Sequence, residues 1–205
     1  MEELTACEGT VHSVIFQNAE NGYTVLRLLT EEGEVVTVVG CIPCVAPGEH
    51  LSAVGTMETH PQHGEQLRAV ELERSLPEDE EEIASYLGSG VVKGVGPATA
   101  RRIVDRFGTE TLDILEREPE RLSLIKGITE RKAMEIAESF RHHMGLRRLM
   151  EFLARYQLPP VLAMQLRRQY GDAALEKVRE NPYLLSGESC GVEFAVTDQI
   201  ALSLG

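Results

Sequence analysis

The sequence lacks any segment that would place the chain in a membrane or direct it across one. Its N-terminus has no basic stretch followed by an apolar one, so no secretory signal is predicted. The longest nearly apolar stretch, residues 35–47, is too short to span a bilayer and is interrupted by Thr37, Gly40 and Pro43. We therefore expect a soluble, cytoplasmic protein with no membrane partner.

Cysteines are also scarce, which argues against a disulfide framework. The four cysteines are Cys7, Cys41, Cys44 and Cys190. Zinc binding by Cys41 and Cys44 would need two more ligands, and only His60 and His63 lie near. A redox site would need a strand-to-helix context, whereas this pair follows a strand-like run. Two half-buried thiols beside a turn are favoured over a metal or redox site.

Basic residues are few: 20 Lys and Arg stand against 33 Asp and Glu, a net charge of −13. This balance alone argues against a nucleic-acid partner. The charge is uneven, however. Residues 1–82 hold 17 acids and 3 bases, net −14, whereas residues 83–205 hold 16 acids and 17 bases, net +1. The second part is therefore free to contact phosphate while the first does something else.

The N-terminal part reads as short strands separated by turns, with no helical period. The predicted strands are Thr10–Phe16, Tyr23–Leu29, Glu34–Val39, His50–Gly55 and Glu65–Leu72. Five strands in so short a stretch indicate a small all-β barrel of the OB type, although an SH3-like barrel would give much the same pattern.

This barrel offers little for binding a single strand, which requires a basic groove and stacking aromatic residues. Its only bases are Arg27, Arg68 and Arg74, and its only aromatic residues are Phe16 and Tyr23. Burial habits favour both aromatic side chains as core residues. We therefore expect a structural barrel, or one whose acidic surface contacts a protein partner.

An acidic run, residues 77–82, marks the boundary and is expected to be solvated and to cap the next helix. Helical periodicity follows. The predicted helices are Ile83–Leu87, Pro97–Phe107, Thr109–Glu116, Pro119–Leu124, Glu130–Phe140, Leu146–Tyr156, Pro160–Tyr170, Ala173–Glu180 and Phe194–Leu204. The sequence thus predicts an OB-like barrel (1–76), an acidic linker (77–82) and an all-α array.

An internal repeat emerges when the helical part is shifted by sixty-three positions. Phe107-Gly108 then falls on Tyr170-Gly171, and Pro119 falls on Pro182. With one inserted residue the match continues to the end of the chain. A duplicated helical unit explains these matches better than the residues that commonly begin and end helices. The predicted units are a first helix-hairpin-helix pair (83–145) and a second, degenerate pair (146–205).

The first unit contains two tight turns suited to phosphate. In the turn at residues 93–97, alternate glycines leave the backbone bare, and Pro97 suits the start of the next helix, whose dipole favours an anion. In the turn at 126–129, Thr129 replaces the second glycine and caps the next helix. The predicted residues that contact the DNA backbone are Lys93, Gly94, Val95, Gly96, Thr99, Arg101, Arg102, Lys126, Gly127, Thr129, Arg131 and Lys132.

Other interpretations of these turns compete. Gly88 and Gly90 precede them as in a dinucleotide fingerprint, but that fingerprint must follow a strand. A purely structural helix-to-helix turn is the more serious competitor. In the second unit the corresponding turns have lost glycines or gained an acid, so that unit is expected to act first as scaffold. Its arginines, Arg147, Arg148, Arg167 and Arg168, are expected to be solvated.

Several stretches together resemble the N-terminal region of long, stand-alone RecD-like (YrrC-type) ATP-dependent DNA helicases. They are Asn18–Leu26, Val39-Gly40, Gly48-Glu49, His60–Leu67, Tyr86–Pro97, Phe107–Leu112 and Asn181–Leu184. The resemblance covers almost the whole chain. It implies an OB-like domain followed by tandem helix-hairpin-helix modules. In that family a superfamily 1 motor follows and unwinds DNA with 5′ to 3′ polarity, using ATP and, by expectation, Mg²⁺.

No Gly-x-x-x-x-Gly-Lys-Ser/Thr loop occurs in the chain, so ATP hydrolysis is expected only of the intact protein. No catalytic, cofactor or metal residues are predicted within it, because no histidine is placed beside a nucleophile or acid. The expected partners are DNA of unknown strand type and the C-terminal motor of the same polypeptide. Two alternatives remain: a RuvA-like junction-binding subunit, and a protein-interaction scaffold that does not bind DNA.

Overall fold

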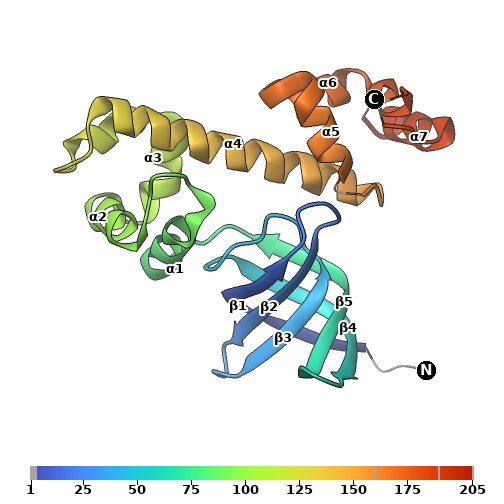
Figure 1. Ribbon diagram of the computed structural model, residues 1–205, viewed down its shortest axis with the longest axis horizontal. Helices are drawn as coiled ribbons and strands as arrows, with labels where there is room; N and C mark the ends of the chain where they lie inside the picture. The colour runs from blue at the N-terminus through green and yellow to red at the C-terminus, as the bar shows by residue number, and fades with distance from the viewer. Residues whose placement is uncertain (1–3, 160, 189, 205) are drawn as a thin grey trace. The chain divides into compact units, whose positions relative to one another are not determined.

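A computed structural model describes residues 4–159, 161–188 and 190–204. Five strands close into a barrel in the order β1-β2-β3-β5-β4 (Figure 1). Neighbouring strands are antiparallel, except that β3 and β5 pair in parallel. The strands are β1 (Leu4–Gln17), β2 (Tyr23–Thr30), β3 (Val35–Cys41), β4 (His50–His60) and β5 (Gly64–Ser75). This closed topology confirms the OB-like barrel.

Alternating side chains build the barrel interior. Along β2, Thr24, Leu26 and Leu28 are fully buried, and the residues between them face outward. Gly55 allows two strands to approach closely, because a Cβ there would lie 1.9 Å from the Arg68 carbonyl oxygen. The core comprises Val11, Leu26, Leu28, Val38, Ile42, Val45, Leu51, Ala53 and Leu67. Apolar burial therefore stabilises the barrel.

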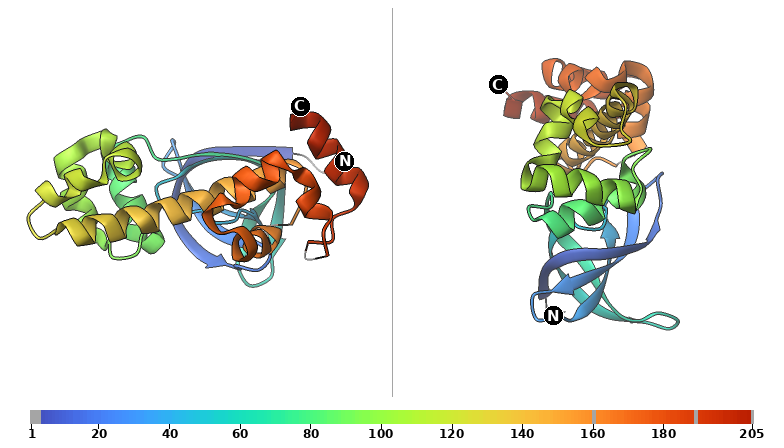
Figure 2. Two further views of the ribbon diagram at one scale, coloured as in Figure 1. Left: turned by 90° about the horizontal axis from the view of Figure 1, so that it is seen from above. Right: turned by 90° about the vertical axis from the view of Figure 1, so that its left-hand side faces the viewer.

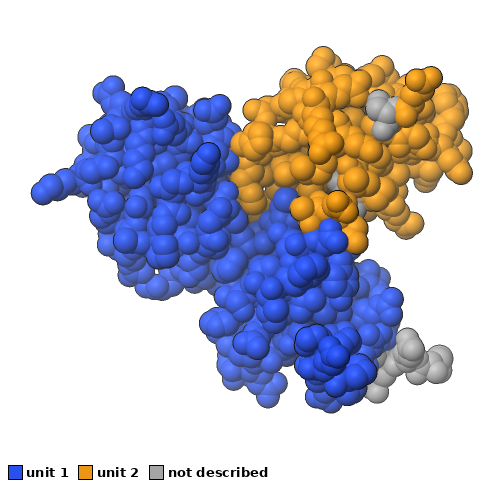
Figure 3. Space-filling view, in the orientation of Figure 1, with its two compact units in different colours: residues 1–18, 23–141 blue, residues 19–22, 142–205 orange. Residues whose placement is uncertain are grey.

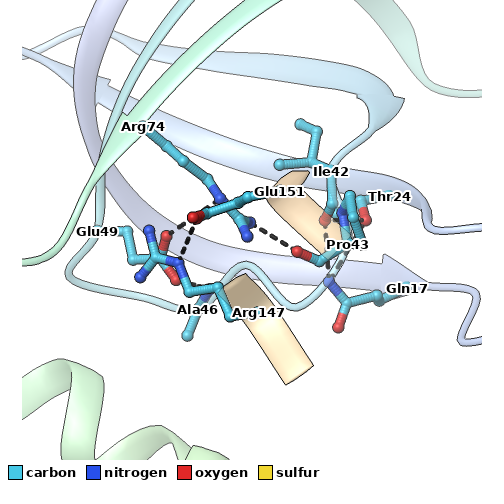
Figure 4. Close-up of polar contacts among 9 residues, drawn as sticks. All are labelled: Gln17, Thr24, Ile42, Pro43, Ala46, Glu49, Arg74, Arg147 and Glu151. Carbon is cyan, nitrogen blue, oxygen red and sulfur yellow. Dashed lines mark hydrogen bonds and ion pairs between the residues drawn. The ribbon is translucent and has the colours of Figure 1, made fainter. Parts of the chain in front are cut away.

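A buried polar cluster fixes the connection between β3 and β4 (Figure 4). Arg74 Nη1 donates a hydrogen bond to the Pro43 carbonyl oxygen at 2.6 Å, and Arg74 Nε lies 4.0 Å from Glu49 Oε2. The fully buried Glu49 also accepts a hydrogen bond from the Ala46 N–H at 3.1 Å. Burying a carboxylate requires such partners. One of the few barrel arginines is thus committed to structure.

The acidic run joins helix α1 (Glu80–Tyr86) to the barrel. Asp79 caps the helix as predicted, accepting a hydrogen bond from the Glu82 N–H at 2.8 Å. Glu82, in contrast, is not solvated. Its Oε1 accepts a hydrogen bond from Thr10 Oγ1 at 2.6 Å and lies 3.5 Å from His50 Nε2. The expectation of a solvated run holds for the exposed acids at 78–81 and is wrong for Glu82, because polar groups of the barrel, far away in sequence, face this carboxylate.

The first helical repeat follows α1, and its helices gather beside the N-terminal half of α4 (Figures 1 and 2). Its elements are a π-helical turn (Leu87–Val91), α2 (Pro97–Phe107), a 3₁₀ turn (Gly108–Glu110), α3 (Thr111–Arg117), a second 3₁₀ turn (Pro119–Leu124) and α4 (Glu130–Arg155). Gly88 and Gly90 follow a helix, not a strand. The dinucleotide-binding interpretation is therefore excluded.

Helix α4 is continuous over Glu130–Arg155, so the prediction of two separate helices here is wrong. Buried side chains recur at helical spacing, as at Ile136, Phe140 and Met144, and continue to Leu153. A single interior glycine, Gly145, costs about 1 kcal/mol and does not end a helix whose apolar face continues. Neither α4 nor any other helix of the described ranges is long and apolar enough to cross a membrane.

The second helical repeat has the same order of elements as the first. They are α5 (Val161–Tyr170), a 3₁₀ turn (Gly171–Ala173), α6 (Ala174–Glu180), a 3₁₀ turn (Pro182–Ser186) and α7 (Phe194–Leu204). Matched core residues have no exposed surface in either repeat: Ala100 and Ala163, Ile103 and Leu166, Leu122 and Leu185. The duplication predicted from the shifted sequence is confirmed.

The chain divides into two compact units (Figure 3). The first comprises Met1–Asn18 with Tyr23–Arg141, and so contains the barrel and most of the first helical repeat. The second comprises Ala19–Gly22 with His142–Gly205, and so contains the second repeat. The division between the repeats falls inside α4.

Candidate nucleic-acid interface

The first hairpin, residues 92–97, is a tight turn anchored by two buried valines. Val92 and Val95 are 1% and 4% exposed, and the Val95 N–H donates to the Val92 carbonyl oxygen at 3.2 Å. Gly94 between them has φ 84°. A Cβ there would meet nothing within 4 Å, so the backbone conformation, not lack of space, requires glycine. Gly96 then forms the N-cap of α2.

The second hairpin repeats this geometry at the start of α4. Ile125 and Ile128 are buried, and the Ile128 N–H donates to the Ile125 carbonyl oxygen at 3.0 Å. Gly127 between them has φ 90°. Thr129 Oγ1 accepts a hydrogen bond from the Lys132 N–H at 3.2 Å, which confirms the predicted cap. The two hairpins are therefore equivalent in backbone and in anchoring.

Both turns present backbone donors next to a helix N-terminus. Within the described ranges, the N–H groups of Gly94, Gly96, Thr99 and Gly127 have no hydrogen-bond acceptor. The N-terminus of a helix also carries a partial positive charge. Donors and dipoles of this kind bind phosphate or carboxylate oxygens.

Arg102 links the two hairpins. Its Nη1 donates a hydrogen bond to the Lys126 carbonyl oxygen at 2.8 Å, and its Nη2 to Thr99 Oγ1 at 3.4 Å. A Cβ at Gly127 would lie 3.3 Å from Nη1, so the guanidinium sits directly against the second turn. Arg102 and Lys126, which are both predicted DNA contacts, thus also hold the two hairpins beside each other.

Exposed lysines give each turn a positive charge. Lys93 and Lys126 are exposed, and neither has an ion-pair partner in the part of the chain that the structure describes. The half-buried Lys132 lies in the first turn of α4. One lysine on each turn is a simple arrangement for two phosphates of a nucleic-acid backbone.

Two predicted contact residues, Arg101 and Arg131, form exposed ion pairs with carboxylates of the protein. Arg101 Nη1 lies 2.8 Å from Glu81 Oε1 and its Nε lies 3.2 Å from Asp105 Oδ1. The hydrogen bond to Glu81 raises the pKa of Arg101 above its ordinary value. Arg131 Nε lies 3.0 Å from Glu135 Oε1. The sequence indicates two of these ion pairs, because Asp105 and Glu135 each lie four residues after the arginine that they contact. The pair with Glu81 could not be predicted in this way, because Glu81 belongs to a different helix.

Sequence reasoning missed one basic residue beside the hairpins. Arg106 lies four residues after Arg102, and both line an open groove that also includes Lys126 and Leu124. Leu124 is 63% exposed and gives the groove an apolar side chain beside the basic ones. The groove contains one carboxylate, Asp105. The i, i+4 spacing of the two arginines was the available signal.

The hairpins of the second repeat keep the backbone but not the chemistry. Gln157, which matches Gly94, has φ 57°, and Gly191, which matches Gly127, has φ 64°. At the position of Gly96 stands Pro159, which has no N–H to donate. This repeat therefore has the fold of the first without its donors or lysines.

Two arginines of the second repeat stabilise its structure and are not solvated as predicted. Arg147 is 3% exposed, with its Nε 2.8 Å from Glu151 Oε1. The Arg167 side chain is 10% exposed, donates to the His142 carbonyl oxygen at 2.7 Å and also contacts Asp172. The expectation is wrong because acceptors on a neighbouring turn or helix face these side chains.

The barrel aromatic residues are exposed, so the expectation that they are core residues is wrong. Phe16 and Tyr23 are 50% and 43% exposed, with ring centroids 6.4 Å apart. A β-bulge between Val14 and Phe16 shifts the alternation of β1 and turns Phe16 outward. Tyr23 lies on the outer face of β2, as the alternation with buried Thr24 requires.

No described residues form a group of three or more potential metal ligands. All four cysteines are thiols; Cys44 is half-buried as expected, whereas Cys41, at the end of β3, is exposed and the expectation is wrong for it. Cys44 has a left-handed backbone with φ 56°. The His60 and His63 rings stack on each other with centroids 4.6 Å apart.

Comparisons with known proteins agree with this architecture. Residues 3–77 match the OB-fold domain of the ATP-dependent DNA helicase YrrC. Residues 89–142 match the SAM-like tandem helix-hairpin-helix, and residues 142–205 match the helix-hairpin-helix domain of the ATP-dependent RecD2 DNA helicase.

A full-length relative shows the same correspondence. The ATP-dependent RecD2 DNA helicase of Deinococcus radiodurans is 32% identical over 199 residues, which cover 94% of this chain and 27% of that protein. The chain thus spans about a quarter of the length of this relative. By domain order and by this identity, the chain corresponds to the N-terminal region of RecD-like DNA helicases.

Proposed function

We propose that the first helical repeat binds the phosphate backbone of DNA without reading sequence. The observation that best supports this proposal is the pair of equivalent hairpins at 93–97 and 126–129, joined by the Arg102 hydrogen bond to Lys126. The contact residues are those predicted from the sequence, with Arg106 added. Arg101 and Arg131 are among these contact residues, and each would approach the DNA while it remains paired with a carboxylate of the protein.

The chemistry of the turns supports this assignment. Each turn offers an N–H group of a left-handed glycine, Gly94 or Gly127, and each carries one exposed lysine, Lys93 or Lys126. Both kinds of group bind phosphate oxygens regardless of the attached base. We expect binding that is independent of sequence, because backbone N–H groups at helix N-termini contact phosphate oxygens, which are the same at every base.

We further propose that the intact protein is a superfamily 1 DNA helicase that moves 5′ to 3′ using ATP and Mg²⁺. The support is the similarity of the chain to the N-terminal part of proteins named as ATP-dependent DNA helicases. The 205 residues contain no Gly-x-x-x-x-Gly-Lys-Ser/Thr loop, so they do not fit ATP. Their part is to hold DNA for a motor located elsewhere in the polypeptide.

The test is the salt dependence of DNA binding. Fluorescence anisotropy of a labelled duplex and a labelled single strand would be measured between 50 and 200 mM salt, about the range over which phosphate contacts weaken strongly. In Lys93→Glu/Lys126→Glu, we expect the slope of log K against log salt to fall by about 2, because each phosphate contact contributes about 0.9.

A charge-matched variant controls for net charge. Arg155→Glu/Arg168→Glu changes two exposed bases of the second unit and alters the total charge equally. We expect it to keep the parental slope within about 0.5, since most of the effect comes from local contacts. Equal losses in both variants would contradict the hairpin assignment. Absence of DNA binding by the parent would favour the scaffold alternative.

A further inference from the structure

The barrel carries a pocket that the hairpin function does not use. It has a volume of about 520 Å³ and lies on the outer face of β1–β3 and against the β4–β5 turn. Its aromatic and polar walls include Phe16, Tyr23, Arg27, His60, His63 and Gln66. We call these six residues the aromatic pocket. This face and these turns are where OB folds hold oligonucleotides and oligosaccharides.

The aromatic pocket exposes flat rings suited to stacking. Phe16 is 50% exposed and Tyr23 is 43% exposed, with a tilt of 53° between their planes. Exposed apolar side chains that gather in one place with polar residues around them are typical of binding grooves. The stacked imidazoles of His60 and His63 also line the pocket. An unstacked nucleobase has the shape and the π-face that such rings bind.

The charge of the pocket differs from that of the barrel around it. Residues 1–82 carry 17 acids and 3 bases, yet the pocket is lined by Arg27 and two histidines and by no carboxylate. Glu58, which pairs with Gln66 across the hairpin, is bound to Arg68 at 3.2 Å. The acidity of the domain therefore does not extend into the pocket.

We propose that the aromatic pocket binds unstacked bases of single-stranded DNA. Phe16 and Tyr23 stack on the bases, Arg27 contacts the adjoining phosphate, and Gln66 together with the histidines contacts base edges. Duplex DNA does not enter, because its bases are already stacked and paired. The pocket contacts bases and the hairpins contact the backbone, so this site goes beyond the function proposed above and is independent of it.

Two probes separate base contacts from backbone contacts. The 205-residue chain would be titrated at low salt with a labelled oligothymidylate and with an abasic oligonucleotide of equal length. Binding by hairpins alone is equal for both probes, whereas base stacking favours the oligothymidylate. In Phe16→Ala/Tyr23→Ala, we expect binding of oligothymidylate to weaken at least fivefold, and binding of the abasic probe to stay unchanged.

Matched variants guard against loss of folding. Phe16→Tyr and Tyr23→Phe keep a ring at each position and are expected to retain binding. Val70→Ala removes a more exposed apolar side chain, 65% exposed, from β5 outside the pocket and is expected to leave the binding of both probes unchanged. If Phe16→Ala/Tyr23→Ala binds oligothymidylate as the parent does, the proposal is wrong, whatever the hairpin variants show.

A direct signal is available because the chain contains no tryptophan. Phe16→Trp introduces the sole indole at the pocket. We expect its fluorescence to be quenched in a saturable way by oligothymidylate but not by the abasic probe. The quenching should persist in the Lys93→Glu/Lys126→Glu background, which separates failure of the hairpins from failure of the pocket. Equal quenching by both probes, or none, would refute base stacking at this site.

Discussion

The two helical repeats share a backbone and differ in what their turns present. Lys93 of the first repeat matches Tyr156 of the second, and Gly96 matches Pro159. Yet the intervening residue has positive φ in both, 84° at Gly94 and 57° at Gln157. Buried positions preserve the fold of a duplicated unit, while its exposed turn residues can change without loss of structure. Family resemblance of the second repeat is therefore evidence of fold and not of phosphate binding.

The second pair of turns follows the same rule. Gly127 and Gly191 both have positive φ, but Thr129, which caps α4, is replaced by Glu193 before α7. A carboxylate at that position repels a phosphate at the helix N-terminus even though it suits the helix dipole. The second repeat thus keeps a stable helix start and loses the anion site.

The largest expected effect tests whether the two cores are equivalent. Leu122→Ala and Leu185→Ala each remove a leucine with no exposed surface, and each should lower the free energy of unfolding by about 2–5 kcal/mol. Urea unfolding followed by circular dichroism measures both. Leu124→Ala, at a position 63% exposed in the same 3₁₀ turn, is the control and should cost less than about 0.5 kcal/mol. A small effect at only one of the two buried leucines would show that the repeats are stabilised differently.

Next in size is the backbone strain at the first hairpin. Gly94→Ala places a Cβ on a residue with φ 84° and should destabilise by about 1–2 kcal/mol. Gln157→Ala leaves a Cβ where one already exists, at φ 57°, and should be nearly neutral. Urea unfolding of the two variants compares them directly. If Gly94→Ala and Gln157→Ala changed the free energy of unfolding equally, the two turns would not share the requirement for a left-handed residue.

The barrel, the repeat and the turns could be predicted because each depends on short-range patterns. Strand alternation, glycines such as Gly94 and Gly127, and the Thr129 cap act over a few residues. Contacts between distant segments could not be predicted in this way. Glu82 is bound by Thr10 of the barrel, Arg101 by Glu81 of another helix, and these partners follow only from tertiary packing.

Two local features also escaped prediction, for different reasons. The bulge in β1 inverts the alternation, and so Phe16, which hydrophobicity alone assigns to the core, faces outward. The prediction of separate helices, Glu130–Phe140 and Leu146–Tyr156, left Gly145 outside both. The apolar face that continues on both sides of Gly145 outweighs the low helix propensity of glycine, and α4 continues to Arg155.

Removing the cap of the second hairpin is expected to have a moderate effect. Thr129→Ala abolishes the hydrogen bond from the Lys132 N–H and should destabilise by about 1 kcal/mol. Thr129→Ser keeps the hydroxyl and should restore stability, as thermal unfolding would show. Because Thr129→Ser keeps both the cap and a hydroxyl that can donate to phosphate, it should also retain the parental DNA affinity. A stable Thr129→Ala variant would mean that this turn does not depend on its cap.

The smallest expected effect runs in the opposite direction. Gln157→Gly relieves a left-handed residue, worth about 1–2 kcal/mol, but gives the unfolded chain more freedom, which costs about 0.4–1 kcal/mol. The net result should be a gain of about 0.5–1 kcal/mol in the free energy of unfolding. DNA affinity should not change, because Tyr156 and Pro159 still supply neither charge nor donor. If Gln157→Gly instead strengthened DNA binding, the bare backbone alone would suffice for phosphate, and the lysines of the first repeat would lose their proposed role.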